Sequence, residues 1–327
     1  MTFIDFCAGI GGGRLGLELN GLQCIGYSEI DKEAVKTYKK LHDAENEINF
    51  GDITKINPAL LPDFDLLIAG FPCQTFSIVG KREGLKNDKE GQIIYYLAEI
   101  LRIKQPQYFI LENVKGLVNH NGGKTFQEVL KLLEYAGYNV YFDVINSINF
   151  LPQSRERIYF IGIKHSARIK YSYSELNNML FSNISSKTEY SLKTFLNPTE
   201  ENLFAEVSAS YKTFLKYLNN KYNKGKFCIN ELLRKDYLII DIRQSDLRLY
   251  ENRVPTLRRN RQGILYVYKN QFYTLGALDA LRLQGFDKIK NLENKIIGLK
   301  KQDILKQCGN AMSVNVIENL AFNLLRI

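Results

Sequence analysis

The sequence predicts an α/β protein, built on a doubly wound and mostly parallel sheet, with a smaller and irregular second domain. Short apolar runs alternate with amphipathic stretches over about the first 165 residues, which is typical of strand–helix–strand units. Near residue 164 the composition shifts towards Asn, Lys, Ser and Tyr, and the alternation is lost. We therefore expect a main domain over residues 1–165 and a less regular region that begins near residue 166.

Length and composition are those of an ordinary globular protein of 327 residues, with 45% hydrophobic and 24% charged residues. No apolar run is long enough to span a bilayer, and the N-terminus lacks the pattern of a signal peptide. The five cysteines are widely spaced, and they form neither a zinc motif nor a disulfide framework. We expect a cytoplasmic protein without a structural metal.

The elements follow from local patterns. Buried strands are expected where short apolar runs are rich in β-branched and aromatic residues, and helices where apolar residues recur every three to four positions. The predicted strands lie at residues 2–7, 23–28, 64–69, 108–111, 138–145 and 158–163, and the predicted helices at 14–20, 32–41, 93–104, 125–135, 274–284 and 313–325.

A glycine turn and two acids follow the first strands. Ala-Gly-Ile-Gly-Gly-Gly at residues 8–13 follows the first strand, Glu29 ends the second, and Asp52 follows a short run after the next helix. Ligands bind at the carboxyl ends of parallel strands, where an acid suits ribose hydroxyls. A lone glycine turn often binds nothing, and a lone acid there is usually a solvated helix cap. Together, the three positions predict a cofactor site, although the turn is not the dinucleotide fingerprint.

A candidate nucleophile follows the strand at residues 64–69. Gly-Phe-Pro-Cys-Gln-Thr-Phe-Ser at residues 70–77 places Cys73 just past that strand's carboxyl end. Pro72 fixes its own φ and biases Phe71 towards an extended conformation, so the next side chain has a defined direction. Most unpaired cysteines are small core residues, but a thiol at a ligand-binding edge can serve as a nucleophile. The polar segment at residues 80–91 reads as a mobile surface loop beside it, or as an ordinary solvated loop.

Further charged residues are expected at the same edge of the sheet. Glu112 ends the strand at residues 108–111, and Gln153, Arg155 and Arg157 alternate onto one face of an extended segment, which gives a row of hydrogen-bond donors. Basic and aromatic residues interleave from about residue 170 to residue 261, and the formal net charge is +9. This pattern favours a nucleic-acid partner, with a solvated basic surface as the alternative.

In their order and spacing these segments resemble the motifs of DNA (cytosine-5)-methyltransferases of the compact bacterial restriction–modification type. Only about residues 164–240 lie outside any motif. The matching segments are residues 5–12 (cofactor turn), 70–77 (Pro-Cys-Gln), 112–114 (Glu-Asn-Val), 153–157 (Gln-x-Arg-x-Arg), 253–257 (the start of the motif that packs the recognition domain), and 281–286 with 309–312 (closing motif).

The resemblance implies the fold of S-adenosylmethionine-dependent methyltransferases, with residues 1–165 as the catalytic and cofactor-binding domain and residues 166–269 as the target-recognition domain. It also implies that a C-terminal segment over residues 270–327 returns to complete the catalytic domain and its sheet. A cytosine would flip out of the DNA duplex, and Cys73 would add to its C6. Glu112 would hydrogen-bond and protonate N3, Arg157 would hold the O2 side, and Arg155 would support the nucleophile. C5 would then take the methyl group, leaving S-adenosylhomocysteine, with no metal involved.

The same resemblance assigns binding positions, with Glu29 at the ribose and Asp52 and Ile53 at the adenine. Cys7 stands where relatives carry a phenylalanine, Ile30 where an aromatic residue is usual, and Ala-Met at residues 311–312 replaces Ser-Val. The cofactor positions are Phe6, Cys7, Gly9, Gly11, Gly12, Glu29, Ile30, Asp52, Ile53 and Asn310. The expected DNA-contacting positions are Gln74, Ser77, Lys81, Arg82, Gln153, Arg243, Arg258, Arg259 and Arg261.

Double-stranded DNA is the expected partner of a monomeric enzyme, with a separately acting restriction endonuclease as its cognate and no membrane association. Three alternatives stay open: methylation of transfer RNA, a non-catalytic DNA-binding relative, and a nicotinamide dehydrogenase, which would share the glycine turn and Glu29 but would not need the Pro-Cys-Gln segment. The residues do not encode which DNA sequence is recognised.

Overall fold

The computed structural model describes residues 1–72, 93–167, 170–182 and 190–327, and its contacts divide the chain into two compact units. The first unit contains residues 1–146, 156–185 and 311–327, and the second contains residues 147–155 and 186–310. These boundaries differ from the expected ones, because residues 270–310 group with the second unit. One reason is the buried Asp279 carboxylate, which accepts hydrogen bonds from the Asn197 N–H at 2.7 Å and the Gly276 N–H at 2.8 Å.

The first unit is built on a sheet whose order is β2-β1-β3-β4-β7-β5 in the described residues. The strands β2, β1, β3 and β4 are parallel neighbours, while β7 is antiparallel to both β4 and β5. Their central residues are buried on both faces, as expected of a sheet covered by helices. The predicted fold class is confirmed. The strands are β1 (Thr2–Phe6), β2 (Gln23–Ser28), β3 (Leu66–Gly70), β4 (Tyr108–Val114), β5 (Tyr138–Asn146) and β7 (Glu156–Lys164).

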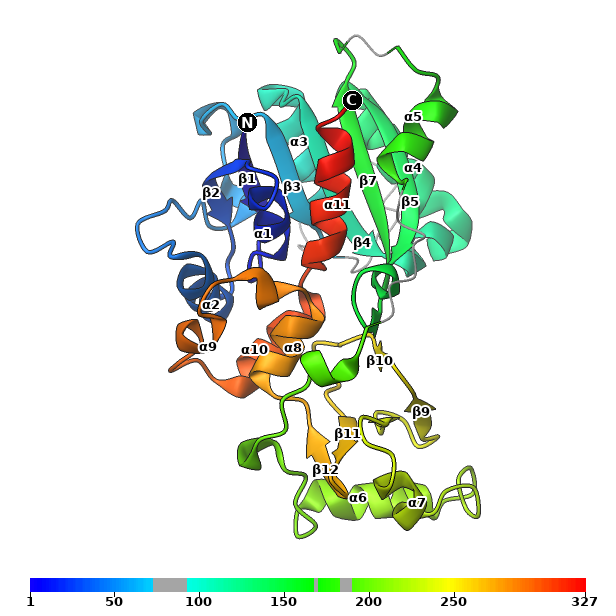
Figure 1. The fold of residues 1–327 in the computed structure, drawn as a ribbon. Coiled ribbons are helices and arrows are strands. Elements are labelled where there is room, and N and C mark those ends of the chain that lie inside the picture. The colour runs from blue at the N-terminus through cyan, green and yellow to red at the C-terminus, as the bar shows by residue number, and fades with distance from the viewer. Residues whose placement is uncertain (73–92, 168–169, 183–189) are drawn as a thin grey trace. The chain divides into compact units, whose positions relative to one another are not determined.

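Helices cover both faces of this sheet. In Figure 1, α1, α5 and α11 lie on one face, and α3 and α4 on the other. The C-terminal segment contributes the helix α11, which packs against α1 and α5, and it adds no strand to the described sheet, contrary to expectation. The helices are α1 (Gly12–Glu18), α2 (Lys32–His42), α3 (Ile93–Lys104), α4 (Lys124–Tyr135), α5 (Tyr173–Leu180) and α11 (Val314–Leu324).

The second unit has its own sheet and its own core. An antiparallel sheet of order β12-β11-β8-β9 packs with α6 and α7 around the buried Phe214, Leu265 and Phe272, and a two-residue ladder pairs β6 with β10. The strands are β6 (Gln153–Ser154), β8 (Ile239–Asp241), β9 (Arg248–Tyr250), β10 (Val254–Pro255), β11 (Ile264–Tyr268) and β12 (Gln271–Thr274). The helices are α6 (Ala209–Leu218), α7 (Ile229–Leu233), α8 (Ala277–Leu283), α9 (Leu292–Lys295) and α10 (Lys301–Asn310).

Candidate active site

The turn after β1 is formed by left-handed backbone. Cys7, Gly9 and Gly11 have φ angles of 51°, 57° and 81°, a region that favours glycine. Apart from its two chain neighbours, no described residue comes within 4 Å of the position that a Cβ on Gly9 would occupy. The backbone at Gly9 is therefore open to a ligand.

Gly11 and Gly12 allow close packing within the first unit. A Cβ on Gly11 would collide with the imidazole of His42, and a Cβ on Gly12 with the carbonyl oxygen of Met312. Both glycines are buried. The sequence did not indicate this packing role, and the contact of the two glycines with the cofactor stays a prediction.

Glu29 lies directly beside the open backbone of Gly9. Its Oε2 accepts a hydrogen bond from the Gly9 N–H at 2.8 Å, and its Oε1 accepts bonds from the Ile30 and Asp31 N–H groups, each at 2.8 Å. Three N–H donors fix the position of the Glu29 carboxylate at the carboxyl end of β2.

Asn49 connects Glu29 to the segment that carries Asp52, and sequence reasoning missed it. Its Oδ1 accepts from the Glu29 N–H at 3.1 Å and from the Gly51 N–H at 2.9 Å, while its Nδ2 donates to the Glu29 carbonyl at 3.0 Å. Asp52 follows, and its Oδ1 accepts from both the N–H (3.0 Å) and the hydroxyl (2.8 Å) of Thr54. The two predicted acids are thus brought together through one amide side chain.

The apolar cofactor positions divide into exposed and buried ones. Ile30 is 69% exposed, whereas Phe6 is fully buried and Ile53 is 5% exposed. Phe6 packs on Phe64 with ring centroids 6.3 Å apart, so its side chain belongs to the core, and the predicted cofactor contact is not available to it. Ile30 remains accessible beside Glu29.

The cysteine thiols with shifted pKa values are poor candidates for a nucleophile. Burial raises the pKa of the Cys7 thiol far above its usual range, and the nearby Glu29 carboxylate adds to the shift. Burial likewise raises the pKa of Cys24 to about 12 and that of Cys308 still further. These three groups stay protonated at neutral pH, and a protonated thiol is a weak nucleophile.

Glu112 and Arg157 form an ion pair at the edge of the sheet where β3 ends. Arg157 Nε lies 2.9 Å from Glu112 Oε1, with side-chain exposures of 14% and 8%. The register pairs Glu112 with Gly70, the last residue of β3, and Glu112 Oε2 would be 3.5 Å from a Cβ on Gly70. The carboxylate therefore lies beside the entry to the Phe71–Pro72 segment, as predicted from the strand ends.

Asn113 fixes the same segment and was not predicted. Its buried Nδ2 donates to the Phe71 carbonyl at 3.0 Å, and its Oδ1 accepts from the Val114 N–H at 2.8 Å. Losing a buried hydrogen bond of this kind leaves a carbonyl unsatisfied, so Asn113 defines the direction in which the chain leaves β3.

Gln153 and Arg155 use their side chains inside the second unit. Gln153 is fully buried, and its amide donates to the Leu283 carbonyl at 2.7 Å and accepts from the Leu257 N–H at 3.2 Å. Arg155 donates to the carbonyls of Leu257 and Gly309 at 3.3 and 3.2 Å. The sequence did not indicate these partners, and the DNA contact of Gln153 stays a prediction.

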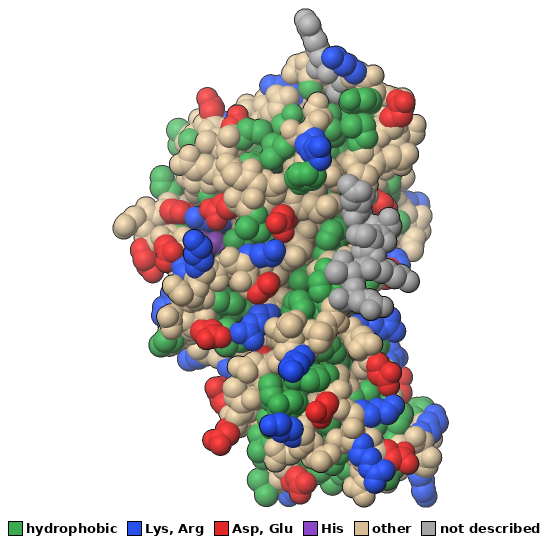
Figure 2. Space-filling model, viewed as in Figure 1, with side chains coloured by type: hydrophobic (Ala, Val, Ile, Leu, Met, Phe, Trp, Pro, Cys, Tyr) green, Lys and Arg blue, Asp and Glu red, His purple; other side chains and the backbone are tan. Residues whose placement is uncertain are grey.

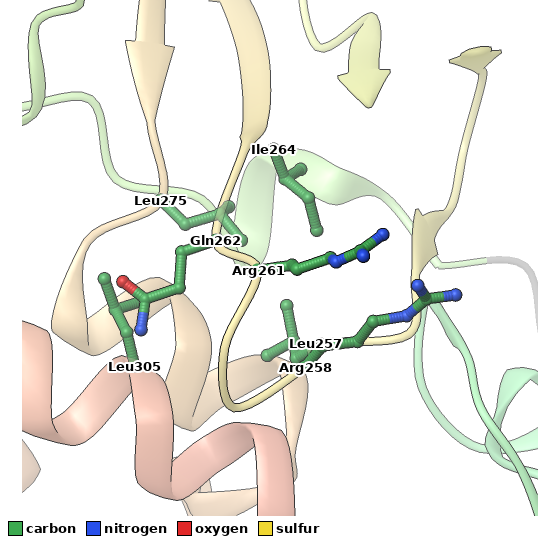
Figure 3. A pocket seen from close by; sticks show the side chains of 7 residues that line it. All are labelled: Leu257, Arg258, Arg261, Gln262, Ile264, Leu275 and Leu305. Atoms are coloured by element: carbon green, nitrogen blue, oxygen red, sulfur yellow. The ribbon is translucent and has the colours of Figure 1, made fainter. Parts of the chain in front are cut away.

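The predicted DNA-contacting arginines of the second unit divide into one buried side chain and three exposed ones. Arg243 has a side-chain exposure of 4%, and its guanidinium pairs with the Asp241 carboxylate inside the unit. Arg258, Arg259 and Arg261 are exposed on the loop between β10 and β11. Figure 3 shows Arg258 and Arg261 extending to the same side of this loop, away from Leu275 and Leu305. The adjoining pocket of about 10 Å³ holds at most one water molecule.

Several predicted positions are not placed by the structure. Cys73, Gln74, Ser77, Lys81 and Arg82, with the predicted loop at residues 80–91, lie outside the described residues. Asn310 is exposed at the end of α10 in the second unit. The predicted roles of these residues, and the support that Arg155 gives to Cys73, stay predictions.

Comparison with known proteins agrees with this arrangement. A sequence model of the family described as C-5 cytosine-specific DNA methylase matches residues 1–326. The chain belongs to this family. It is 43% identical over 320 residues to the type II methyltransferase M.NgoBI of Neisseria gonorrhoeae, covering 96% of this chain and 90% of that protein.

Other relatives match a part of the chain or the fold alone. The type II methyltransferase M.BsuFI of Bacillus subtilis is 49% identical over 163 residues, which are 50% of this chain and 39% of that protein. The Dnmt2 methyltransferase of S. pombe superposes with a TM-score of 0.69 over 99% of this chain and 98% of that one, at 19% identity. In the described part of this family member, no helix has the length and apolarity needed to cross a membrane.

Proposed function

We propose that the protein transfers a methyl group from S-adenosylmethionine to C5 of a cytosine flipped out of double-stranded DNA, as the modification enzyme of a type II restriction–modification system. The observation that carries this proposal is the Glu112–Arg157 pair, which lies beside the segment leading into Cys73. Its family supports cytosine as the base, and the names of its relatives support the type II assignment.

In the proposed reaction, the Cys73 thiolate adds to C6 and breaks the C5–C6 double bond of the base. Glu112 donates a proton to N3 as negative charge develops there, which is general acid catalysis. Arg157, held through its Nε by Glu112, directs its guanidinium to the O2 side of the ring. After methylation, the C5 proton is lost to a base, Cys73 leaves as the thiolate, and the N3 proton returns to Glu112.

The cofactor site is proposed at the carboxyl ends of β1 and β2. S-adenosylmethionine supplies the electrophilic methyl group when it is bound. The residues fit such a ligand, because the open backbone at Gly9 lies next to the Glu29 carboxylate and Gly51, beside Asp52, is open as well. Glu29 would accept the ribose hydroxyls, and Asp52 with Ile53 would adjoin the adenine.

Substituting Glu29 with Gln is expected to weaken binding of S-adenosylhomocysteine by about tenfold or more, because a neutral amide is a weaker acceptor than a carboxylate for the ribose hydroxyls that Glu29 is proposed to bind. Isothermal titration calorimetry measures this, with Glu33→Gln as an exposed control on α2. An analogue without the ribose 2′-hydroxyl should bind both Glu29→Gln and wild type with similar affinity. If Glu29→Gln still preferred S-adenosylhomocysteine over this analogue as strongly as wild type does, the assignment of Glu29 to the ribose would be contradicted.

The DNA-contacting surface is proposed on the loop that carries Arg258, Arg259 and Arg261. On the face drawn in Figure 2, Lys and Arg side chains are interspersed with Asp and Glu, so the net charge alone does not locate the DNA. Exposed arginines at close spacing on one loop can neutralise neighbouring phosphates. A separately acting restriction endonuclease, a monomeric state and a cytoplasmic location complete the proposal.

Methyl transfer from labelled S-adenosylmethionine tests the proposed function directly. Duplex DNA and transfer RNA are offered in parallel, and the product is mapped at base resolution. We expect label at C5 of cytosine within one short DNA sequence, which would also identify the recognition site. Label in transfer RNA alone would replace this proposal with the RNA alternative, and cofactor binding without transfer to either would point to a non-catalytic DNA-binding relative.

A further inference from the structure

Arg243 and Asp241 form a closed fork inside the second unit. Arg243 Nε donates to Asp241 Oδ1 at 2.8 Å and Nη2 donates to Oδ2 at 2.7 Å, with side-chain exposures of 4% and 11%. The remaining terminal nitrogen, Nη1, donates to the carbonyl of Thr256 at 2.6 Å. The guanidinium therefore joins the end of β8 to a residue just after β10.

The same short segment is held by residues 153–155. The Thr256 hydroxyl donates to the Ser154 carbonyl at 2.6 Å. The Leu257 N–H donates to Gln153 Oε1 at 3.2 Å, and its carbonyl accepts from Arg155 Nη1 at 3.3 Å. Thr256 and Leu257 are thus held by hydrogen bonds from Arg243 on one side and to residues 153–155 on the other.

The fixed segment ends where the exposed arginines begin. Leu257 is 5% exposed, and Arg258, the next residue, is exposed together with Arg259 and Arg261. Because the Arg258 and Arg261 side chains extend to one side of the loop (Figure 3), the direction of the chain at Thr256 determines where both guanidinium groups point.

We propose that Arg243 is a positioning residue for DNA binding: through Thr256 it sets the orientation in which Arg258 and Arg261 meet the DNA phosphates. This inference rests on the proposed function, and it replaces the direct DNA contact that the sequence suggested for Arg243. Asp241 keeps the guanidinium in the plane that reaches Thr256, which a lysine ammonium cannot reproduce, because it lacks the planar fork.

The chain contains a matched control. Asp246 and Arg248 repeat the spacing of Asp241 and Arg243, and Arg248 Nη2 lies 3.0 Å from Asp246 Oδ2. This second pair is solvent-exposed, with side-chain exposures of 54% for Arg248 and 48% for Asp246. An Arg→Lys change therefore keeps the charge at either position, but it disturbs the Thr256 segment only at Arg243.

The experiment compares Arg243→Lys with Arg248→Lys, each in wild type and in an Arg258→Ala/Arg261→Ala background. The affinity for the methylated DNA duplex is measured over a range of salt concentrations. Arg243→Lys should bind about tenfold more weakly, and its slope of log K against log salt should fall by about one or more, since each lost phosphate contact lowers the slope by about 0.9. Arg248→Lys should stay within about twofold of wild type.

Non-additivity is the decisive readout, because a loss of fold alone would not produce it. In the Arg258→Ala/Arg261→Ala background, Arg243→Lys should weaken binding by no more than about twofold. An unchanged slope for Arg243→Lys, or the same tenfold loss in both backgrounds, would overturn the proposal. If Arg243→Lys does not fold, the same binding measurements are made on Asp241→Asn, with Asp246→Asn as its control. Failure of the wild type to bind or methylate DNA would instead overturn the proposed function, and this inference with it.

Discussion

Replacing Cys73 with serine is expected to reduce methyl transfer to DNA by at least about 10³-fold, the scale on which enzymes respond to loss of a catalytic nucleophile. A free cysteine has a few per cent thiolate at neutral pH and is intrinsically nucleophilic, whereas a serine hydroxyl is a weak nucleophile without an adjacent base. The described thiols with raised pKa values cannot substitute for Cys73. Single-turnover transfer from labelled S-adenosylmethionine measures the loss.

The control for this variant is Cys228→Ser, which alters an exposed thiol in the second unit and should retain full activity. Binding of S-adenosylhomocysteine should be unchanged in both variants. DNA that carries 5-fluorocytosine at the target adds a second test. Elimination of Cys73 requires removal of a proton from C5, and a base cannot remove fluorine in its place. The Cys73–C6 bond therefore persists. Wild type should form a complex stable in detergent and Cys73→Ser should not. Transfer by Cys73→Ser at a tenth of the wild-type rate or more would contradict the proposed role.

Much of the fold could be predicted because strands that are buried on both faces appear in the sequence as continuous apolar runs. The run predicted at residues 64–69 becomes β3 (Leu66–Gly70), and that at residues 138–145 becomes β5 (Tyr138–Asn146). The ends of such strands are also visible in sequence, which is why the placement of Glu29 and Glu112 at the carboxyl ends of β2 and β4 was predicted correctly. The grouping of residues 270–310 was not, since it depends on long-range packing that local patterns do not carry.

Two polar side chains have partners that the sequence did not reveal. Gln153 and Arg243 look available in a sequence, but both side chains are buried. Each donates a hydrogen bond to a carbonyl distant along the chain, Gln153 to that of Leu283 and Arg243 to that of Thr256. Burying a polar group is costly unless it is hydrogen-bonded, and those partners become apparent only after folding.

The residues that sequence reasoning missed are two asparagines whose side chains hold the backbone beside the candidate site. Asn49 and Asn113 each bind main-chain groups of another segment, Glu29 and Phe71 respectively. An asparagine in a loop or at a strand end is common, so no local signal separates these two from solvated ones. The Glu-Asn-Val segment marked Asn113 as part of a motif without revealing what its amide holds.

Replacing Glu112 with glutamine is expected to lower kcat by about 10² to 10⁴-fold, the contribution typical of a positioned general acid. Glutamine has nearly the same size, so its side-chain oxygen can keep the place of Glu112 Oε1, which lies 2.9 Å from Arg157 Nε in the ion pair. The amide cannot give a proton to N3, so the addition of Cys73 to C6 would build up uncompensated charge on the ring. Rapid-quench measurement of a single turnover separates this chemical step from DNA binding, which should change by less than about threefold.

Glu156→Gln is the matched control, because Glu156 lies on β7 next to Arg157 and forms an exposed ion pair with Lys115 at 2.8 Å. That variant should keep kcat within about twofold of wild type, since exposed pairs contribute little. Glu112→Gln should also form the 5-fluorocytosine complex far more slowly than wild type, because the missing proton is needed when the Cys73–C6 bond forms. A normal rate of complex formation in Glu112→Gln would place the role of Glu112 after that bond, and thus contradict its assignment as the acid that assists the attack.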